Sequence, residues 1–92
     1  MISGRQIRAA RAMLGWSAHE LATRAGLGYN TVVRAESVDG LPSMRTPNLL
    51  AIQQALEKGD EKGSVIFFSA GETPRPGGDG VRLRIALRRP PA

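Results

Sequence analysis

Apolar positions in the N-terminal half of the chain recur at intervals of three and four residues, which is the spacing of a helix with one buried face. In residues 3–14 these positions are Ile7, Ala10 and Leu14. Ser3 precedes them as an N-cap and Gln6 follows at the third position, so the two residues predict a capping box. We expect a first helix over residues 3–14 that ends at Gly15.

The same start signals recur twice before residue 37. Ser17 and Glu20 have the spacing of a second capping box, and Gly26 suits the left-handed conformation that ends a helix. Gly28 is a permissible N-cap for a third helix over residues 28–36. Apolar pairs at the spacing of a hydrophobic staple flank the three caps, namely Ile2 with Ile7, Trp16 with Leu21, and Leu27 with Val32. These signals predict two short helices joined by a tight glycine turn.

A loop and a fourth helix are expected next. Residues 37–45 contain a glycine and a proline and predict a loop. Thr46 followed by Pro47 is a favourable helix start, because proline suits the first helical position. The apolar stripe of this helix consists of Leu49, Ile52 and Leu56. We expect Gly59 to end it.

The pattern changes after Gly63. The apolar run at residues 65–68 predicts a short buried strand, and residues 71–80 are rich in turn-forming residues. Residues 81–88 have the period of two that a strand with one covered face shows. Their apolar positions are Val81, Leu83, Ile85 and Leu87, and their arginines are Arg82, Arg84 and Arg88. Since a two-stranded hairpin is marginal alone, it must pack on the helices or pair with another chain.

The fold class expected from these elements is mainly α, with four helices followed by a C-terminal β-hairpin. We expect a helical domain over residues 1–59 and a hairpin extension with a tail over residues 60–92. A chain of 92 residues has a thin core, so dimerisation would add stability. The apolar faces of residues 65–68 and 81–87 are the expected dimer surface, through strand pairing between chains.

Composition narrows the classes of function. Lys and Arg number 13 against 8 Asp and Glu, which gives a net charge of +5, and eleven of the 13 are arginine. Arginine side chains suit phosphates and guanine edges, so the excess of basic residues suggests a polyanionic partner. A soluble basic protein without such a partner would have the same net charge. One histidine, no cysteine and no clustered carboxylates predict no enzyme, no metal site and no cofactor. Without an apparent signal peptide or membrane span, we expect a cytoplasmic protein with no membrane partner.

The predicted third helix has an informative outer face. When Val32 is set at the inward centre and each residue turns by about 100°, Asn30 and Arg34 point nearly outward. Thr31 and Val33 lie on the flanks, and Tyr29 lies in the first turn.

These side-chain types suit DNA. Asparagine can form two hydrogen bonds with an adenine edge, and arginine can do so with guanine. Val33 matches a thymine methyl group, while Thr31 and Tyr29 can donate to bases or phosphates. Any solvated helix exposes polar residues, but the preceding helix, the short turn and the basic charge favour DNA recognition here.

The same projection turns Glu36 toward the core, where a carboxylate normally needs a partner. Arg11 lies about 40° from the stripe of Ile7 on the first helix and faces the same interior. We predict an ion pair between Arg11 and Glu36 that sets the pose of the third helix. The alternative is two solvated charges at the edge of the core.

Residues 3–57 resemble the Xre type of helix-turn-helix regulators, which share the fold of phage lambda-type repressors and Cro proteins. The matching residues, at the spacing of the family, are Arg11, Ser17, Glu20, Leu21, Ala22, Gly26, Leu27, Val32 and Glu36. The small Ala22 suits close packing of two helices. The family commonly carries a glutamine that clamps a phosphate where this chain has Ala18, and Gly28 replaces the usual hydroxyl cap.

The resemblance implies a lambda repressor-like helix-turn-helix bundle that regulates transcription, often as a dimer on a two-fold operator. The positions for base contact fall on Tyr29, Asn30 and Arg34, with Thr31 and Val33 beside them. Phosphate contacts are expected at the start of the second helix, from Ser17, the backbone at Ala18, and His19. Arg45 follows in the loop where family members contact the DNA backbone.

The sequence therefore predicts a bacterial, sequence-specific repressor that binds double-stranded DNA as a homodimer. The alternative is an antitoxin or adaptor with the same fold, whose hairpin at residues 65–88 holds a toxin or another protein. The arginines at positions 82, 84 and 88 form either a second phosphate-binding strip or the solvated side of a strand.

Overall fold

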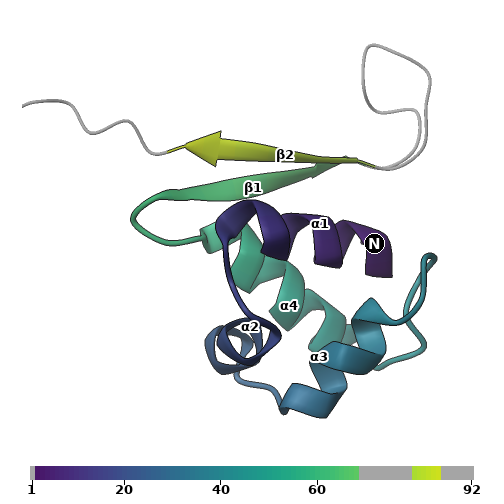
Figure 1. Cartoon of the computed structure of the whole chain (residues 1–92). Coiled ribbons are helices and arrows are strands. Elements are labelled where there is room, and N and C mark those ends of the chain that lie inside the picture. Colours follow the sequence, from purple (N-terminus) through teal and green to yellow (C-terminus); the bar gives the residue numbers. More distant parts are fainter. Residues whose placement is uncertain (1, 69–79, 86–92) are drawn as a thin grey trace, which may run out of the picture.

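The computed structural model describes residues 2–68 and 80–85, where four helices precede an antiparallel hairpin (Figure 1). The elements are α1 (Gly4–Leu14), α2 (Ala18–Ala25), α3 (Tyr29–Glu36), α4 (Thr46–Lys58), β1 (Gly63–Phe68) and β2 (Gly80–Ile85). The hairpin lies on one side of the bundle and α2 and α3 lie on the opposite side (Figure 1).

The first capping box is present at the start of α1. The Ser3 amide donates to Oε1 of Gln6 at 2.8 Å, and the Gln6 amide donates to Oγ of Ser3 at 3.2 Å. Gly15 and Gly26 end α1 and α2 with φ of 70°, a backbone conformation that strains most other residues. The predicted ends of the first two helices are confirmed.

Two predicted helix starts need correction. Oγ of Ser17 accepts a hydrogen bond from the Glu20 amide at 3.0 Å, but the Glu20 carboxylate lies 3.6 Å from Nε of Arg24, one turn further along. The second capping box is therefore only half formed, because the carboxylate is drawn to the guanidinium. In α4, Thr46 is already helical, and Arg45 occupies the N-cap without a side-chain cap bond.

One hydrophobic core joins the four helices to the hairpin. Its fully buried large side chains are Ile7, Leu21, Val32, Ile52 and Leu56. The residues of the three predicted staples all lie in this core or pack against it. Each fully buried aliphatic side chain of this kind contributes about 1.5–3 kcal/mol to folding.

The hairpin covers α1 and α4 with the face that carries Val65, Phe67 and Val81. Val65 is buried in the core, and the other two pack against it. In the register of the hairpin, Val65 is paired with Leu83 and Phe67 with Val81. The protein's own helices therefore cover much of the apolar face at which we expected a second chain, and the dimer itself stays a prediction.

The strands also differ in length from the prediction. β1 begins at Gly63 rather than at residue 65, since the Asp60–Gly63 turn brings the chain into register early. β2 is described from Gly80 to Ile85, and the remainder of the predicted strand, residues 86–88, lies outside the described residues, as do residues 71–79 of the predicted loop.

Gln6 anchors the far end of the hairpin to α1. Its Nε2 donates hydrogen bonds of 2.8 Å to the carbonyl oxygens of both Phe68 and Gly80. Gln6, which completes the capping box of α1, therefore also holds β1 and β2 together at the Phe68–Gly80 end of the hairpin.

Candidate nucleic-acid interface

The two faces of α3 differ as the helical projection predicts. Val32 and Ala35 are buried, and Glu36 is 7% exposed. On the opposite face Tyr29 is 43% and Val33 39% exposed. Asn30 and Arg34 are also exposed, and Thr31 is half-buried. The candidate base-contacting residues thus form one solvent-facing surface, which we call the α3 face.

The turn between α2 and α3 brings the first turns of these helices together. The Leu27 amide donates to the Ala22 carbonyl at 2.9 Å, which closes the end of α2. Gly28 is the N-cap of α3 and has no side chain with which to cap it. Its extended backbone then directs the chain into α3.

His19 and Tyr29 stack across this turn, with ring centroids 3.8 Å apart and planes 12° from parallel. Sequence reasoning treated these residues separately, because a contact across a turn has no periodic signal. The stack fixes the plane of the Tyr29 ring beside the start of α2, so the imidazole of His19 orients a candidate DNA-contacting residue.

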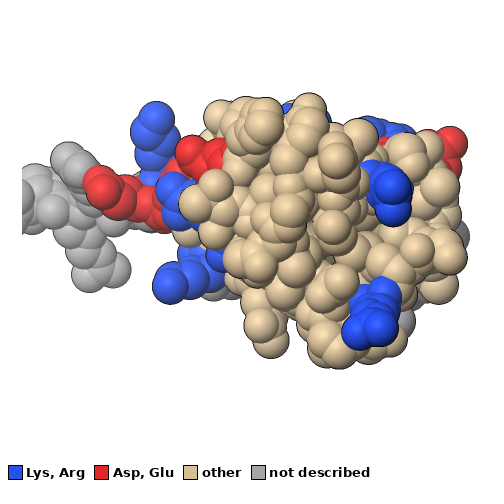
Figure 2. Space-filling model, turned by 90° about the horizontal axis from the view of Figure 1, so that it is seen from below, with Lys and Arg blue, Asp and Glu red and all other residues tan. Residues whose placement is uncertain are grey.

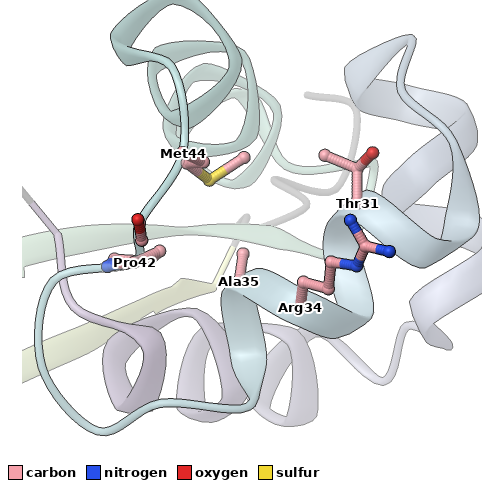
Figure 3. A pocket seen from close by; sticks show the side chains of 6 residues that line it. Thr31, Arg34, Ala35, Pro42 and Met44 are labelled. Atoms are coloured by element: carbon pink, nitrogen blue, oxygen red, sulfur yellow. The ribbon is translucent and has the colours of Figure 1, made fainter.

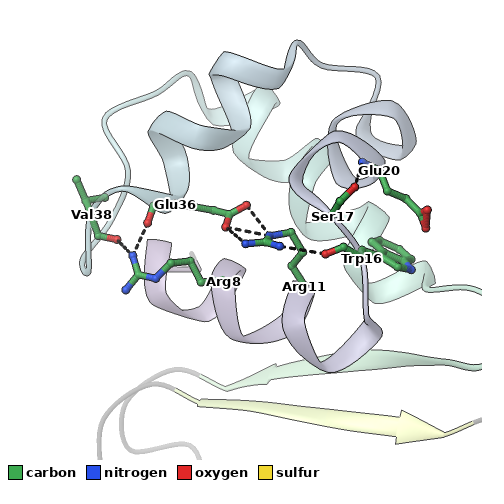
Figure 4. Close-up of polar contacts among 7 residues, drawn as sticks. All are labelled: Arg8, Arg11, Trp16, Ser17, Glu20, Glu36 and Val38. Atoms are coloured by element: carbon green, nitrogen blue, oxygen red, sulfur yellow. Dashed lines mark hydrogen bonds and ion pairs between the residues drawn. The ribbon is translucent and has the colours of Figure 1, made fainter.

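The predicted ion pair between Arg11 and Glu36 is present (Figure 4). Nε of Arg11 lies 3.0 Å from both carboxylate oxygens, and Nη2 donates to Oε1 at 2.9 Å. Nη1 of Arg11 donates to the carbonyl of Trp16 at 3.0 Å. One guanidinium therefore connects α1 to the end of α3 and to the junction between α1 and α2.

Arg8 makes a second connection to the end of α3 (Figure 4). Its Nη1 donates to the carbonyls of Glu36 and Val38, and its Nη2 lies 2.6 Å from Oδ1 of Asp39. A cation at this position satisfies free carbonyls and interacts favourably with the helix dipole. Sequence reasoning missed Arg8, although its spacing of three from Arg11 places both residues on one side of α1.

Gly4 allows α1 to approach the end of α3 closely. Its amide donates to the Gly40 carbonyl at 2.8 Å. A Cβ atom at this position would lie 1.9 Å from the carbonyl oxygen of Val38 and 2.6 Å from that of Ala35. Only glycine fits between these backbones, so Gly4, Arg8 and Arg11 together fix α3 against α1.

A pocket of about 120 Å³ lies beside the α3 face. Thr31, Arg34 and Ala35 line it from the helix, and Pro42, Ser43 and Met44 line it from the following loop (Figure 3). The pocket combines an apolar wall with hydroxyl groups and a guanidinium. This chemistry suits the sugar and phosphate of a nucleic-acid backbone better than a purely apolar ligand.

The candidate phosphate contacts occupy two places. Ser17 and His19 are exposed at the start of α2, whereas the side chain of Ala18 packs toward the core and leaves its backbone amide as the available donor. Arg45 is exposed at the start of α4. On the side formed by α2 and α3, the visible acidic groups lie toward the margins (Figure 2).

The second strip of arginines is described only in part. Arg82 is exposed on β2. The side chain of Arg84 and the whole of Arg88 lie outside the described part of the structure.

Trp16 lies directly before α2 and links it to Asp60, in the turn between α4 and β1. Its Nε1 donates to Oδ2 of Asp60 at 2.9 Å, and the guanidinium carbon of Arg24 lies 4.4 Å from its ring centroid. The hydrogen bond from Trp16 lowers the pKa of Asp60 below its usual value, and the backbone amide of Lys62 adds to this effect. Trp16 is 4% exposed, as expected for a core residue rather than a platform for stacking bases.

Residues 2–68 and 80–85 hold neither a metal-binding cluster nor a membrane-spanning helix. No group of three or more His, Cys, Asp or Glu residues there is arranged to hold a metal ion. No helix in the same ranges has the length and apolar character needed to cross a membrane.

The chain matches no protein-family model, no curated protein and no solved structure.

Proposed function

We propose that this protein is a sequence-specific, double-stranded-DNA-binding transcriptional regulator of the Xre helix-turn-helix type. It acts as a repressor by occupying its operator as a homodimer. The observation that supports this proposal best is the α3 face, where Tyr29, Asn30, Val33 and Arg34 are exposed on a helix whose other face is buried.

The dimensions of α3 suit the major groove. An α-helix with its side chains is about 10–12 Å across, and the groove is about 12 Å wide. Tyr29 and Asn30, in the first turn, would lie deepest in the groove. Asn30 would bind an adenine edge, Arg34 a guanine edge, and Val33 a thymine methyl group.

Phosphate contacts would set the register of the protein on the duplex. The start of α2 offers the Ser17 hydroxyl, the Ala18 amide and His19, and a helix N-terminus favours an anion. Arg45 would contact the backbone on the other side of α3. These contacts do not depend on the base sequence, and they weaken as the salt concentration rises.

The contacts of Gly4, Arg8 and Arg11 support recognition indirectly. A helix that already has its bound pose loses less conformational freedom on binding. These residues hold the C-terminal end of α3 without occupying its outer face, so we assign them to positioning rather than to DNA contact.

Selection of bound fragments from random double-stranded DNA, at two salt concentrations, tests the proposal. We expect one motif, with two-fold symmetry, to be enriched at both concentrations, while total binding falls at the higher one. Enrichment of no motif at either concentration would refute sequence-specific recognition.

A further inference from the structure

The outer edge of β2 has no hydrogen-bonded neighbour in the described part of the structure. There, β2 pairs with β1 alone, and it is the outermost described element in Figure 1. Gly63 of β1 exchanges backbone hydrogen bonds with Asp60 and therefore directs its amide and carbonyl away from β2. Since hydrogen-bonded and non-hydrogen-bonded pairs alternate in an antiparallel ladder, Leu83, opposite Val65, directs its amide and carbonyl to the outer edge of β2. Val81 does so too, so this edge can pair with a further extended strand.

Leu83 also borders an apolar groove between the end of α1 and the hairpin. The groove has a volume of about 240 Å³. Its lining consists of Met13, Leu14, Lys62, Gly63 and Leu83. Because residues directly opposite each other share a face of the sheet, Leu83 lies on the same face as Val65, which is buried in the core. Leu83 is nevertheless 36% exposed and Met13 44% exposed, so the helices leave this margin of the face uncovered.

The other face of β2 is basic. Arg82 is exposed there, and the sequence of β2, Gly80–Ile85, has a second arginine at position 84 and no acidic residue. Two copies of β2 paired about position 82, 83 or 84 would place arginines directly opposite each other, which destabilises a sheet. Acidic residues in those opposite positions would be favourable instead. The charge of β2 therefore disfavours a second copy of this strand and favours an acidic one.

The position of β2 also separates it from the candidate nucleic-acid interface. The hairpin lies on one side of the bundle, and α2 and α3 lie on the opposite side (Figure 1). A duplex bound to the α3 face would therefore lie across the bundle from β2. A second nucleic acid on Arg82 would leave the backbone edge and the apolar groove unfilled, whereas an extended peptide can occupy the edge, the groove and the basic face together.

We propose that β2 binds an extended segment of another protein, in which apolar and acidic residues alternate, as a third, antiparallel strand. Main-chain hydrogen bonds supply affinity in this mode of binding, and alternate side chains supply specificity. Apolar residues opposite Val81 and Leu83 would cover the groove beside Met13, and an acidic residue between them would pair with Arg82. Neither α3 nor DNA takes part in this binding, so it can be tested separately from the proposed function.

Selection of displayed random peptides of about eight residues, a common strand length, tests the proposal on the full chain without DNA. We expect the bound peptides to alternate apolar residues with Asp or Glu. Fluorescence anisotropy of a selected peptide then compares two variants. Arg82→Glu should weaken its binding about tenfold, because an attractive cross-strand pair becomes repulsive. The matched control is Lys58→Glu, the same change of charge at an exposed position on α4, which should leave the affinity unchanged.

A charge swap separates a lost contact from a damaged fold. If the peptide carries Lys at its acidic positions, we expect it to bind Arg82→Glu more tightly than the wild type. Backbone methylation identifies strand addition, because the amides opposite Val81 and Leu83 face β2 and the intervening ones face away. N-methyl groups at the apolar positions should therefore abolish binding, and those at the acidic positions should not.

Each of several results would overturn the proposal. Selected peptides without alternating acidic residues, an unchanged affinity in Arg82→Glu, or equal effects of the two methylation patterns would contradict an acidic third strand. Displacement of the peptide by duplex DNA would assign the edge of β2 to nucleic acid instead. A dimer of the chain that the peptide dissociates would assign this edge to a second copy.

Discussion

Arg11 and Glu36 join α1 to the end of α3 through a guanidinium that approaches both carboxylate oxygens within 3.0 Å. The pair lies at the edge of the core, with the carboxylate the more buried partner. Its position explains how a charged residue can occupy the inner side of the candidate recognition helix.

This geometry predicts strong coupling between the two side chains. Glu36→Leu leaves the Arg11 guanidinium without its carboxylate and should lower the free energy of unfolding by about 3 kcal/mol. Arg11→Met combined with Glu36→Leu should recover much of that loss, since an apolar pair needs no partner. Urea unfolding of both single variants and the double variant measures this. Losses that simply add would show that the pair is not coupled.

Gly4 provides a test of the close approach between α1 and α3. Gly4→Ala places a methyl group against two backbone carbonyls, so the helices must separate, and we expect a loss of about 1–3 kcal/mol. Gly40→Ala is the matched control, because a Cβ atom there meets nothing within 4 Å. Thermal unfolding compares the two variants. Equal stability of the two would contradict the tight contact.

Asp60 predicts a specific dependence of stability on pH. Its pKa is lowered in the folded protein by the hydrogen bond from Trp16, so the folded state binds the proton less readily than the unfolded state. The contribution is therefore present above the unfolded pKa of about 4 and is lost as pH falls through the lower folded pKa. Melting temperatures measured from pH 5 downward should fall less steeply in Asp60→Asn than in the wild type. If the melting temperatures of the two proteins fell with the same slope, Asp60 would not contribute to the acid sensitivity.

The stack of His19 on Tyr29 predicts a positioning role in DNA binding. His19→Ala should free the Tyr29 ring and weaken the preference for the selected DNA motif over unrelated DNA. His19→Phe keeps an aromatic surface and should retain most of that preference. Fluorescence anisotropy with both DNAs provides the comparison. If His19→Phe loses as much preference as His19→Ala, the imidazole acts through its own contact rather than through Tyr29.

Sequence predicted the parts of this fold that depend on local chemistry. Ser3 with Gln6, and the left-handed Gly15 and Gly26, are determined within a few residues of chain. The pair Arg11–Glu36 was also predictable, because helical spacing turns both groups toward the same interior.

Contacts between distant segments could not be predicted in this way. Gln6 bonds to Phe68 and Gly80 only because the hairpin folds back over α1, and no local pattern encodes that. Glu20 had two possible partners at helical spacing, the cap and Arg24, and the spacing alone does not decide between them. The covering of Val65 by α1 and α4 is likewise a property of packing, so an apolar strand face alone could not distinguish a core from a dimer surface.

We propose that the α3 face recognises bases, and Asn30 provides the sharpest test of this proposal. We would measure binding of the wild type and Asn30→Ala to the selected motif and to its single-base variants over a range of salt concentrations. Gln54→Ala, at an exposed position on α4, is the control. We predict that Asn30→Ala loses about 1–3 kcal/mol of discrimination at one base position, with an unchanged salt dependence. An equal loss of affinity for every sequence would contradict it.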